Sequence, residues 1–93
     1  MRGLKLEDFA ANVGAAYSLE SGGSRLSLVL EEANALGQSM REGGSFSLLF
    51  RGPLEPLLPQ GIYTLRNEGD PIDIFLVPIG QDRGGTRYEA IFN

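Results

Sequence analysis

The strongest constraint in this chain is that apolar side chains recur at every second residue over most of its length. Leu26, Leu28 and Leu30 form the clearest run of this kind. Because successive side chains of a β-strand point to opposite faces of a sheet, this period predicts strands with one buried face. No interval between the runs has the pattern of a helical crossover, so the strands are predicted to pair antiparallel.

The chain is predicted to be a single, mostly β domain over residues 1–93. The expected architecture is a small six-stranded antiparallel barrel or sandwich with a short N-terminal helix. The helix is predicted over residues 6–13, where Phe9 and Val13 share one face and Gly14 acts as a stop signal. The predicted strands cover residues 16–20, 25–32, 45–51, 61–66, 72–77 and 86–92.

The connections carry their own signals. Ser21 to Ser24, with two central glycines, predicts a tight hairpin. Residues 34–44 predict a polar loop held by Leu36 and Met40. Pro78 is expected to end the fifth strand, because proline cannot donate a backbone hydrogen bond.

The connector between the third and fourth strands is rich in proline and also apolar. Three prolines within residues 53–59 exclude a helix or a central strand. Leu54, Leu57 and Leu58 are too apolar for a free loop, so we expect them to cap an open end of the core.

Assigning one face of every strand to the interior gives a large expected core. Its members are Leu26, Leu28, Leu30, Phe46, Leu48, Phe50, Tyr63, Leu65, Ile72, Ile74, Leu76, Tyr88, Ala90 and Phe92. Burying each large apolar side chain contributes roughly 1.5–3 kcal/mol, which is enough to hold a domain of this size together.

The opposite face is not simply polar. In the C-terminal half it carries five large apolar residues: Leu49, Ile62, Phe75, Val77 and Ile91. We interpret these five as a candidate contact surface for another subunit or a protein partner. Two alternatives stay open. The N-terminal helix could cover them through Phe9 and Val13, or a bulge could turn Phe75 and Val77 inward. The final strand could also be an edge open to strand addition.

Charge and hydropathy restrict the partners. The net charge is −4, and Arg25, Arg51, Arg66 and Arg87 belong to no basic run, so nucleic acid is not expected. The N-terminus has no secretory signal pattern, and the apolar stretch at Ile74 is too short to span a bilayer. We therefore expect a cytoplasmic protein that does not bind membranes, although export as part of an assembled particle stays open.

The residue types leave little for catalysis. The sequence has no His and no Cys, so its serines have no imidazole base and thiolate metal sites are excluded. The carboxylates Glu68, Asp70, Asp73 and Asp82 lie in or beside turns, where acidic residues bond the local backbone. Their spacing does not match a calcium loop. No enzyme, catalytic residue, metal ion or cofactor is predicted.

Several blocks of the second half resemble a small bacterial family catalogued as a domain of unknown function. They are Phe46–Pro53, Leu58–Tyr63, Ile74–Gly80 and Arg87–Asn93, which occur in this order. The N-terminal half matches only in outline. The resemblance implies an association with genes for phage-tail-like, tail-collar-type proteins, and hence a structural or assembly role. It carries over no catalytic residue.

The sequence thus predicts a non-catalytic structural or protein-interaction module, linked to a phage-tail-like assembly, that binds a protein partner or itself. The alternative is a barrel that binds a small ligand or carbohydrate, either at its mouth near Leu54–Leu58 or at the turns of residues 67–73.

Overall fold

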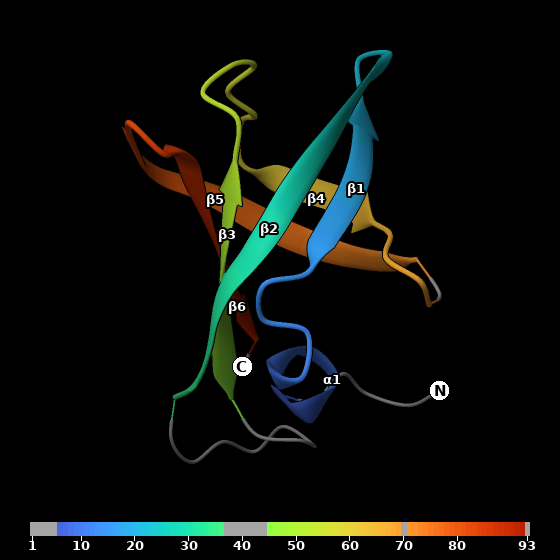
Figure 1. Ribbon diagram of the computed structural model, residues 1–93, viewed down its shortest axis with the longest axis vertical. Coiled ribbons are helices and arrows are strands. Elements are labelled where there is room, and N and C mark those ends of the chain that lie inside the picture. Colours follow the sequence, from blue (N-terminus) through green and yellow to red (C-terminus); the bar gives the residue numbers. More distant parts are fainter. Residues whose placement is uncertain (1–5, 37–44, 70, 93) are drawn as a thin grey trace.

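The computed structural model describes residues 6–36, 45–69 and 71–92. It contains a short helix followed by six strands (Figure 1). These are α1 (Leu6–Ala10), β1 (Ala16–Ser21), β2 (Ser24–Ala35), β3 (Phe46–Gly52), β4 (Gly61–Leu65), β5 (Ile72–Asp82) and β6 (Gly85–Phe92). Every strand pairing is antiparallel, which confirms the predicted class.

The strands form one sheet in the order β1-β2-β3-β6-β5-β4, curled into a nearly closed barrel. β5 makes this curvature possible because its two halves have different neighbours: residues 72–76 pair with β4 and residues 77–82 pair with β6. The outermost strands β1 and β4 meet again at a single bridge between Ser18 and Arg66. The barrel therefore has a seam between its first and fourth strands.

The buried side chains are largely those expected from the alternation. The buried hydrophobic residues are Phe9, Tyr17, Leu19, Leu26, Leu28, Leu30, Phe46, Leu48, Phe50, Leu58, Leu65, Ile74, Leu76, Tyr88 and Ala90. Three expected core residues, Tyr63, Ile72 and Phe92, are only partly buried and pack against this cluster. Ile72 and Phe92 are the end residues of β5 and β6, and Tyr63 lies on β4, an outermost strand of the sheet.

The helix is shorter than predicted and has a different role. It ends at Ala10, because the next backbone bonds, from Asn12 N–H to Phe9 and from Ala15 N–H to Asn12, are turns that lead into β1. Phe9 points into the end of the barrel, with its ring centroid 5.9 Å from Phe46 and 6.0 Å from Phe92. The helix thus closes one end of the barrel (Figure 1).

Two strands are longer than predicted. β2 continues to Ala35, pairing with β3 after a bulge between Leu30 and Glu32, so the expected loop begins later. Residues 37–44 of that loop, including Met40, lie outside the described residues, and Leu36 is exposed. β5 continues through Pro78 to Asp82, because a register shift between Pro78 and Gly80 accommodates the missing N–H.

The connector caps the other end with one leucine instead of three. Leu58 is buried, and its N–H donates to the Tyr88 hydroxyl at 3.0 Å. Leu54 and Leu57 are exposed, contrary to the prediction. At the rim, the side-chain amide of Gln81 donates to the main-chain carbonyl of Leu54 at 2.9 Å.

Replacing Phe9 with alanine tests whether the helix is part of the core. Phe9 is fully buried among aromatic rings, so Phe9→Ala is expected to lower the free energy of unfolding by about 3–5 kcal/mol. Val13, which is 50% exposed, provides the control, and Val13→Ala should change stability by less than about 0.5 kcal/mol. Urea unfolding measures both, and equal effects would contradict this packing.

Candidate interaction surface

The five apolar residues predicted to face outward do not lie in the interior of the barrel. Ile62 is 71% exposed, Ile91 53% and Phe75 51%, whereas Leu49 and Val77 are partly buried. They belong to β3, β6, β5 and β4, which are consecutive in the sheet. We call these five residues the apolar outer surface.

Neither alternative for these residues fits the structure. The helix does not cover them, because Phe9 enters the barrel end and Val13 is itself exposed. No register change turns Phe75 inward, because its neighbours Ile74 and Leu76 are buried and the bulge in β5 begins later, at Pro78.

The pairing register shows which members lie together. Ile62 and Phe75 are direct cross-strand partners on β4 and β5. Leu49 and Val77 are separated by Glu89, which pairs with both. Ile91 lies further along β6, opposite Ser47. The surface therefore consists of an apolar pair beside a second group interrupted by one carboxylate.

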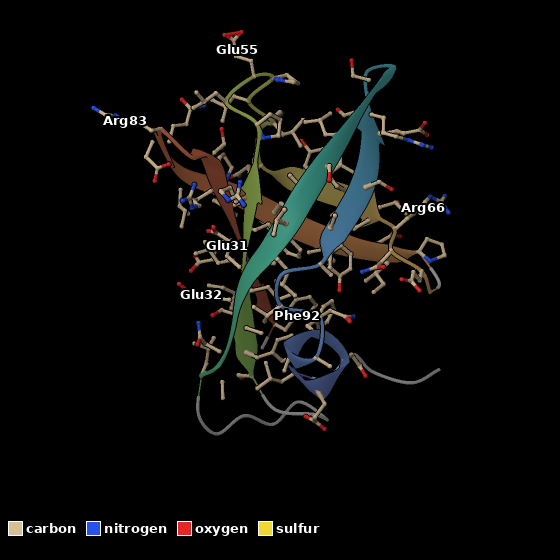
Figure 2. The ribbon with its side chains drawn as sticks, in the orientation of Figure 1. Glu31, Glu32, Glu55, Arg66, Arg83 and Phe92 are labelled. Carbon is tan, nitrogen blue, oxygen red and sulfur yellow. The ribbon has the colours of Figure 1, made fainter. Side chains whose placement is uncertain are left out.

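A cluster of ion pairs forms another part of the outer face around Glu31, which Figure 2 labels. Arg51 and Arg87 are direct partners on β3 and β6, an arrangement that would be repulsive alone. The bulge in β2 places Glu31 beside them, and its carboxylate accepts from Arg51 Nε at 3.0 Å and from Arg87 Nε at 2.8 Å. Arg87 also pairs with Asp82 at 3.2 Å.

The sequence did not indicate this cluster. Glu31 followed the alternation as an ordinary outward residue, and only the extra residue of the bulge directs it toward both guanidinium groups. No sequence signal marked the bulge, because neither of the residues that flank Glu31 is a glycine or a proline.

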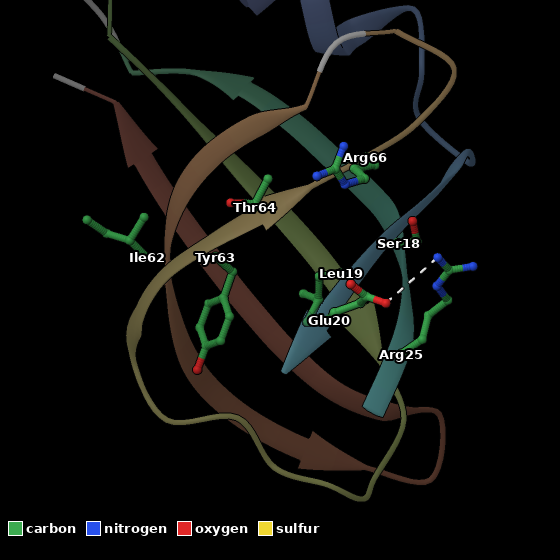
Figure 3. A pocket seen from close by; sticks show the side chains of 8 residues that line it. All are labelled: Ser18, Leu19, Glu20, Arg25, Ile62, Tyr63, Thr64 and Arg66. Atoms are coloured by element: carbon green, nitrogen blue, oxygen red, sulfur yellow. Dashed lines mark ion pairs between the residues drawn. The ribbon is translucent and has the colours of Figure 1, made fainter. Parts of the chain in front are cut away.

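In the part of the chain that the structure describes, the two expected ligand sites, the mouth of the barrel and the turn of residues 67–73, are not arranged as binding sites. Leu58 fills the mouth of the barrel, and the neighbouring hollow of about 510 Å³ lies on the outside, between Arg25, Arg51 and the connector prolines. At the turn of residues 67–73, Asp70 lies outside the described residues, and Asp73 accepts a hydrogen bond from Thr64 Oγ1 at 2.6 Å. A second pocket, of about 270 Å³, lies at the seam between β1 and β4 (Figure 3).

Among the described residues, one has a shifted pKa and no acidic cluster forms a metal site. Desolvation by burial, together with the neighbouring Tyr88 phenol, raises the pKa of Tyr63 above its ordinary value of 10.0. The Tyr63 hydroxyl donates to the Pro59 carbonyl at 2.6 Å. Within the described ranges no three acidic side chains gather as a metal site, and no helix there is long and apolar enough to cross a membrane.

Comparison with known proteins gives a family without an assigned activity. Residues 4–92 match a family described as a domain of unknown function (DUF6916). The match confirms the predicted resemblance at that level and extends it over both halves of the chain. No match was found among curated proteins or among solved structures.

Removing the charge of Glu31 tests the ion-pair cluster. Glu31→Gln leaves Arg51 and Arg87 facing each other, so we expect a loss of about 1 kcal/mol in the free energy of unfolding, larger at low salt. Glu20→Gln is the matched control, because the Glu20–Arg25 pair is 3.9 Å long and mostly exposed. Chemical denaturation at two salt concentrations measures both, and a salt-independent or equal loss would contradict the assignment.

The raised pKa of Tyr63 predicts behaviour at alkaline pH. An unfolded tyrosine ionises near 10.0, while folded Tyr63 stays protonated to higher pH. Its contribution to stability is therefore complete below pH 10 and is lost as the pH rises through the folded pKa. Ultraviolet titration of the protein against Tyr63→Phe isolates this phenol, and a midpoint at or below 10.0 would contradict the structure.

Proposed function

This chain belongs to the DUF6916 family of domains of unknown function, and we propose that it is a non-catalytic protein-interaction module that acts through the apolar outer surface. The observation that carries the proposal is the exposed pair of Ile62 and Phe75 on adjacent strands. A partner, either another protein or a second copy, would bury this pair.

Keeping this apolar pair in water is costly. Side chains this large, with more than half of their surface in water, gain about 25 cal/mol for every Å² that a partner covers. Aromatic residues at the centre of an interface often carry much of the binding energy. Phe75 is the aromatic member of the surface, so we assign it the central position.

The charged residues around the apolar outer surface restrict the kind of partner that it can bind. Glu89 separates Leu49 from Val77, and Asp73 precedes Phe75 on the outward face of β5. A partner that covers the apolar residues would meet Glu89 between Leu49 and Val77 and Asp73 beside Phe75, so basic side chains would be favoured opposite both carboxylates. The same carboxylates, with the net charge of −4, would oppose nucleic acid and anionic membranes.

The proposal extends to location and assembly. We place the protein in the cytoplasm, and we assign its partner to a phage-tail-like assembly on the strength of the family resemblance alone. Purification of the protein with its bound partners from native cells, followed by mass spectrometry, tests this point. Recovery of partners without any tail-like component would contradict the assembly role.

Changing Phe75 to glutamate tests the surface itself. We expect Phe75→Glu to leave the thermal midpoint nearly unchanged, and to weaken self-association or partner capture by about 30-fold or more. Leu57→Glu places the same charge on an exposed leucine of the connector and should leave association unchanged. Light scattering over a concentration series and quantitative capture provide the readouts. A protein that associates equally well with either change would contradict the proposal.

A further inference from the structure

The barrel is held closed between β1 and β4 by one bridge. Ser18 N–H donates to the Arg66 carbonyl at 2.8 Å, and Arg66 N–H donates to the Ser18 carbonyl at 2.8 Å. Across the described parts of these strands, no further backbone bond joins them. Beyond the bridge the strands separate, leaving a gap with Ser18 and Glu20 on one rim and Ile62 and Thr64 on the other (Figure 3).

The bridge identifies the backbone groups that face this gap. Along a strand the N–H and C=O of alternate residues point to the same side. Since Ser18 and Arg66 point toward the seam, so do Glu20 on β1 and both Thr64 and Ile62 on β4. A fully closed barrel would pair Glu20 with Thr64, but pairing ends at the bridge. The edge of β4 thus offers two residues with donors and acceptors ready for another strand.

The edge of β4 also lacks the usual protection. Exposed edges are commonly blunted by charged residues or proline, which prevent pairing with another chain. β4 has the sequence Gly-Ile-Tyr-Thr-Leu, with neither a charge nor a proline, and most of it favours extended structure. An unprotected edge beside a pocket of about 270 Å³ is suited to an extended backbone.

The side chains around the gap would also select the side chains of a bound segment. Ile62 and Thr64 share the outward face of β4, because they alternate with Tyr63 and the buried Leu65. Arg66, the residue after the strand, continues this alternation and is exposed. Ile62 offers apolar surface at the open end. Arg66 lies at the closed end and forms no ion pair within the part of the chain that the structure describes.

We propose that an extended segment of a partner polypeptide adds to the free edge of β4 as a β-strand, antiparallel to it and inside the gap. A β-branched residue of this segment lies beside Ile62. An acidic residue two positions away lies opposite Thr64 and reaches Arg66 diagonally. This site shares Ile62 with the apolar outer surface, but it uses the backbone edge of β4 instead of the Phe75 side chain, so different variants test the two contacts.

Amide hydrogen exchange measured by nuclear magnetic resonance tests the proposal on the intact chain. The probe is a blocked peptide of about six residues, alternating valine and threonine, with one threonine replaced by glutamate. In the free protein, the amides of Ile62 and Thr64 should exchange faster than those of Tyr63 and Leu65, which pair with β5. At saturating peptide, we expect the Ile62 and Thr64 amides to exchange at least about tenfold more slowly.

Two changes to the peptide separate strand addition from nonspecific contact. The same peptide with N-methyl groups on alternate backbone nitrogens should lose this protection, because it cannot donate to β4. A version with lysine in place of glutamate should bind several-fold more weakly. Arg66→Glu should reverse the preference between the two peptides, while Arg83→Glu, in the exposed turn between β5 and β6, should not.

Several results would overturn the proposal. They are unchanged exchange at Ile62 and Thr64 with the peptide at millimolar concentration, equal binding of the N-methylated peptide, and no change of preference in Arg66→Glu. Protection that rises with protein concentration in the absence of peptide would assign the edge to a second copy instead. Because Phe75→Glu should leave peptide binding intact, failure here would not count against the surface centred on Phe75.

Discussion

The structure depends on the need to bury one face of a six-stranded sheet in a chain too short to build a second layer. The sheet meets this need by curling until its own inner face becomes the core. β5 turns the corner, since its first half pairs with β4 and its second half with β6. The helix and the connector close the two ends, through Phe9 and Leu58.

This curvature has consequences on the outside of the barrel. The bulge that bends β2 also directs Glu31 toward two arginines, and a polar cluster forms where like charges would otherwise oppose each other. Elsewhere on the outer face of β3, β6, β5 and β4, large apolar residues remain in water because neither the helix nor the connector covers them. Polar and apolar regions of the outer face therefore follow from the same bending of the sheet.

The proposed contacts use two different properties of the barrel. The apolar outer surface offers side chains, and its partner would be selected mainly by area and by charges at the rim. The gap beside β4 offers main-chain groups, and its partner would be selected by extended conformation and alternating side chains. A domain with both can hold two partners, or one partner at two points, which suits a role in assembly.

Much of the fold was predictable because period-two alternation is a local property. Leu26, Leu28 and Leu30 are buried as expected, and so are Phe46, Leu48 and Phe50. Ile62 and Phe75 were also correctly placed outside. The prediction was wrong where a distant partner decided the outcome. The strand β5 passes through Pro78 because β6 tolerates a bulge there. Of the three connector leucines only Leu58 is buried, where its N–H donates to the distant Tyr88 hydroxyl.

The amino-acid order alone specified antiparallel strands, their inward faces and an unusual apolar remainder on the outside, since each of these depends on neighbours along the chain. The tertiary structure decided the strand order, the fate of Phe9 and the incomplete seam between β1 and β4. Alternation states which side of a strand is buried, but it contains no information about which two edges meet. That outcome depends on how far the whole sheet curls before its core is filled.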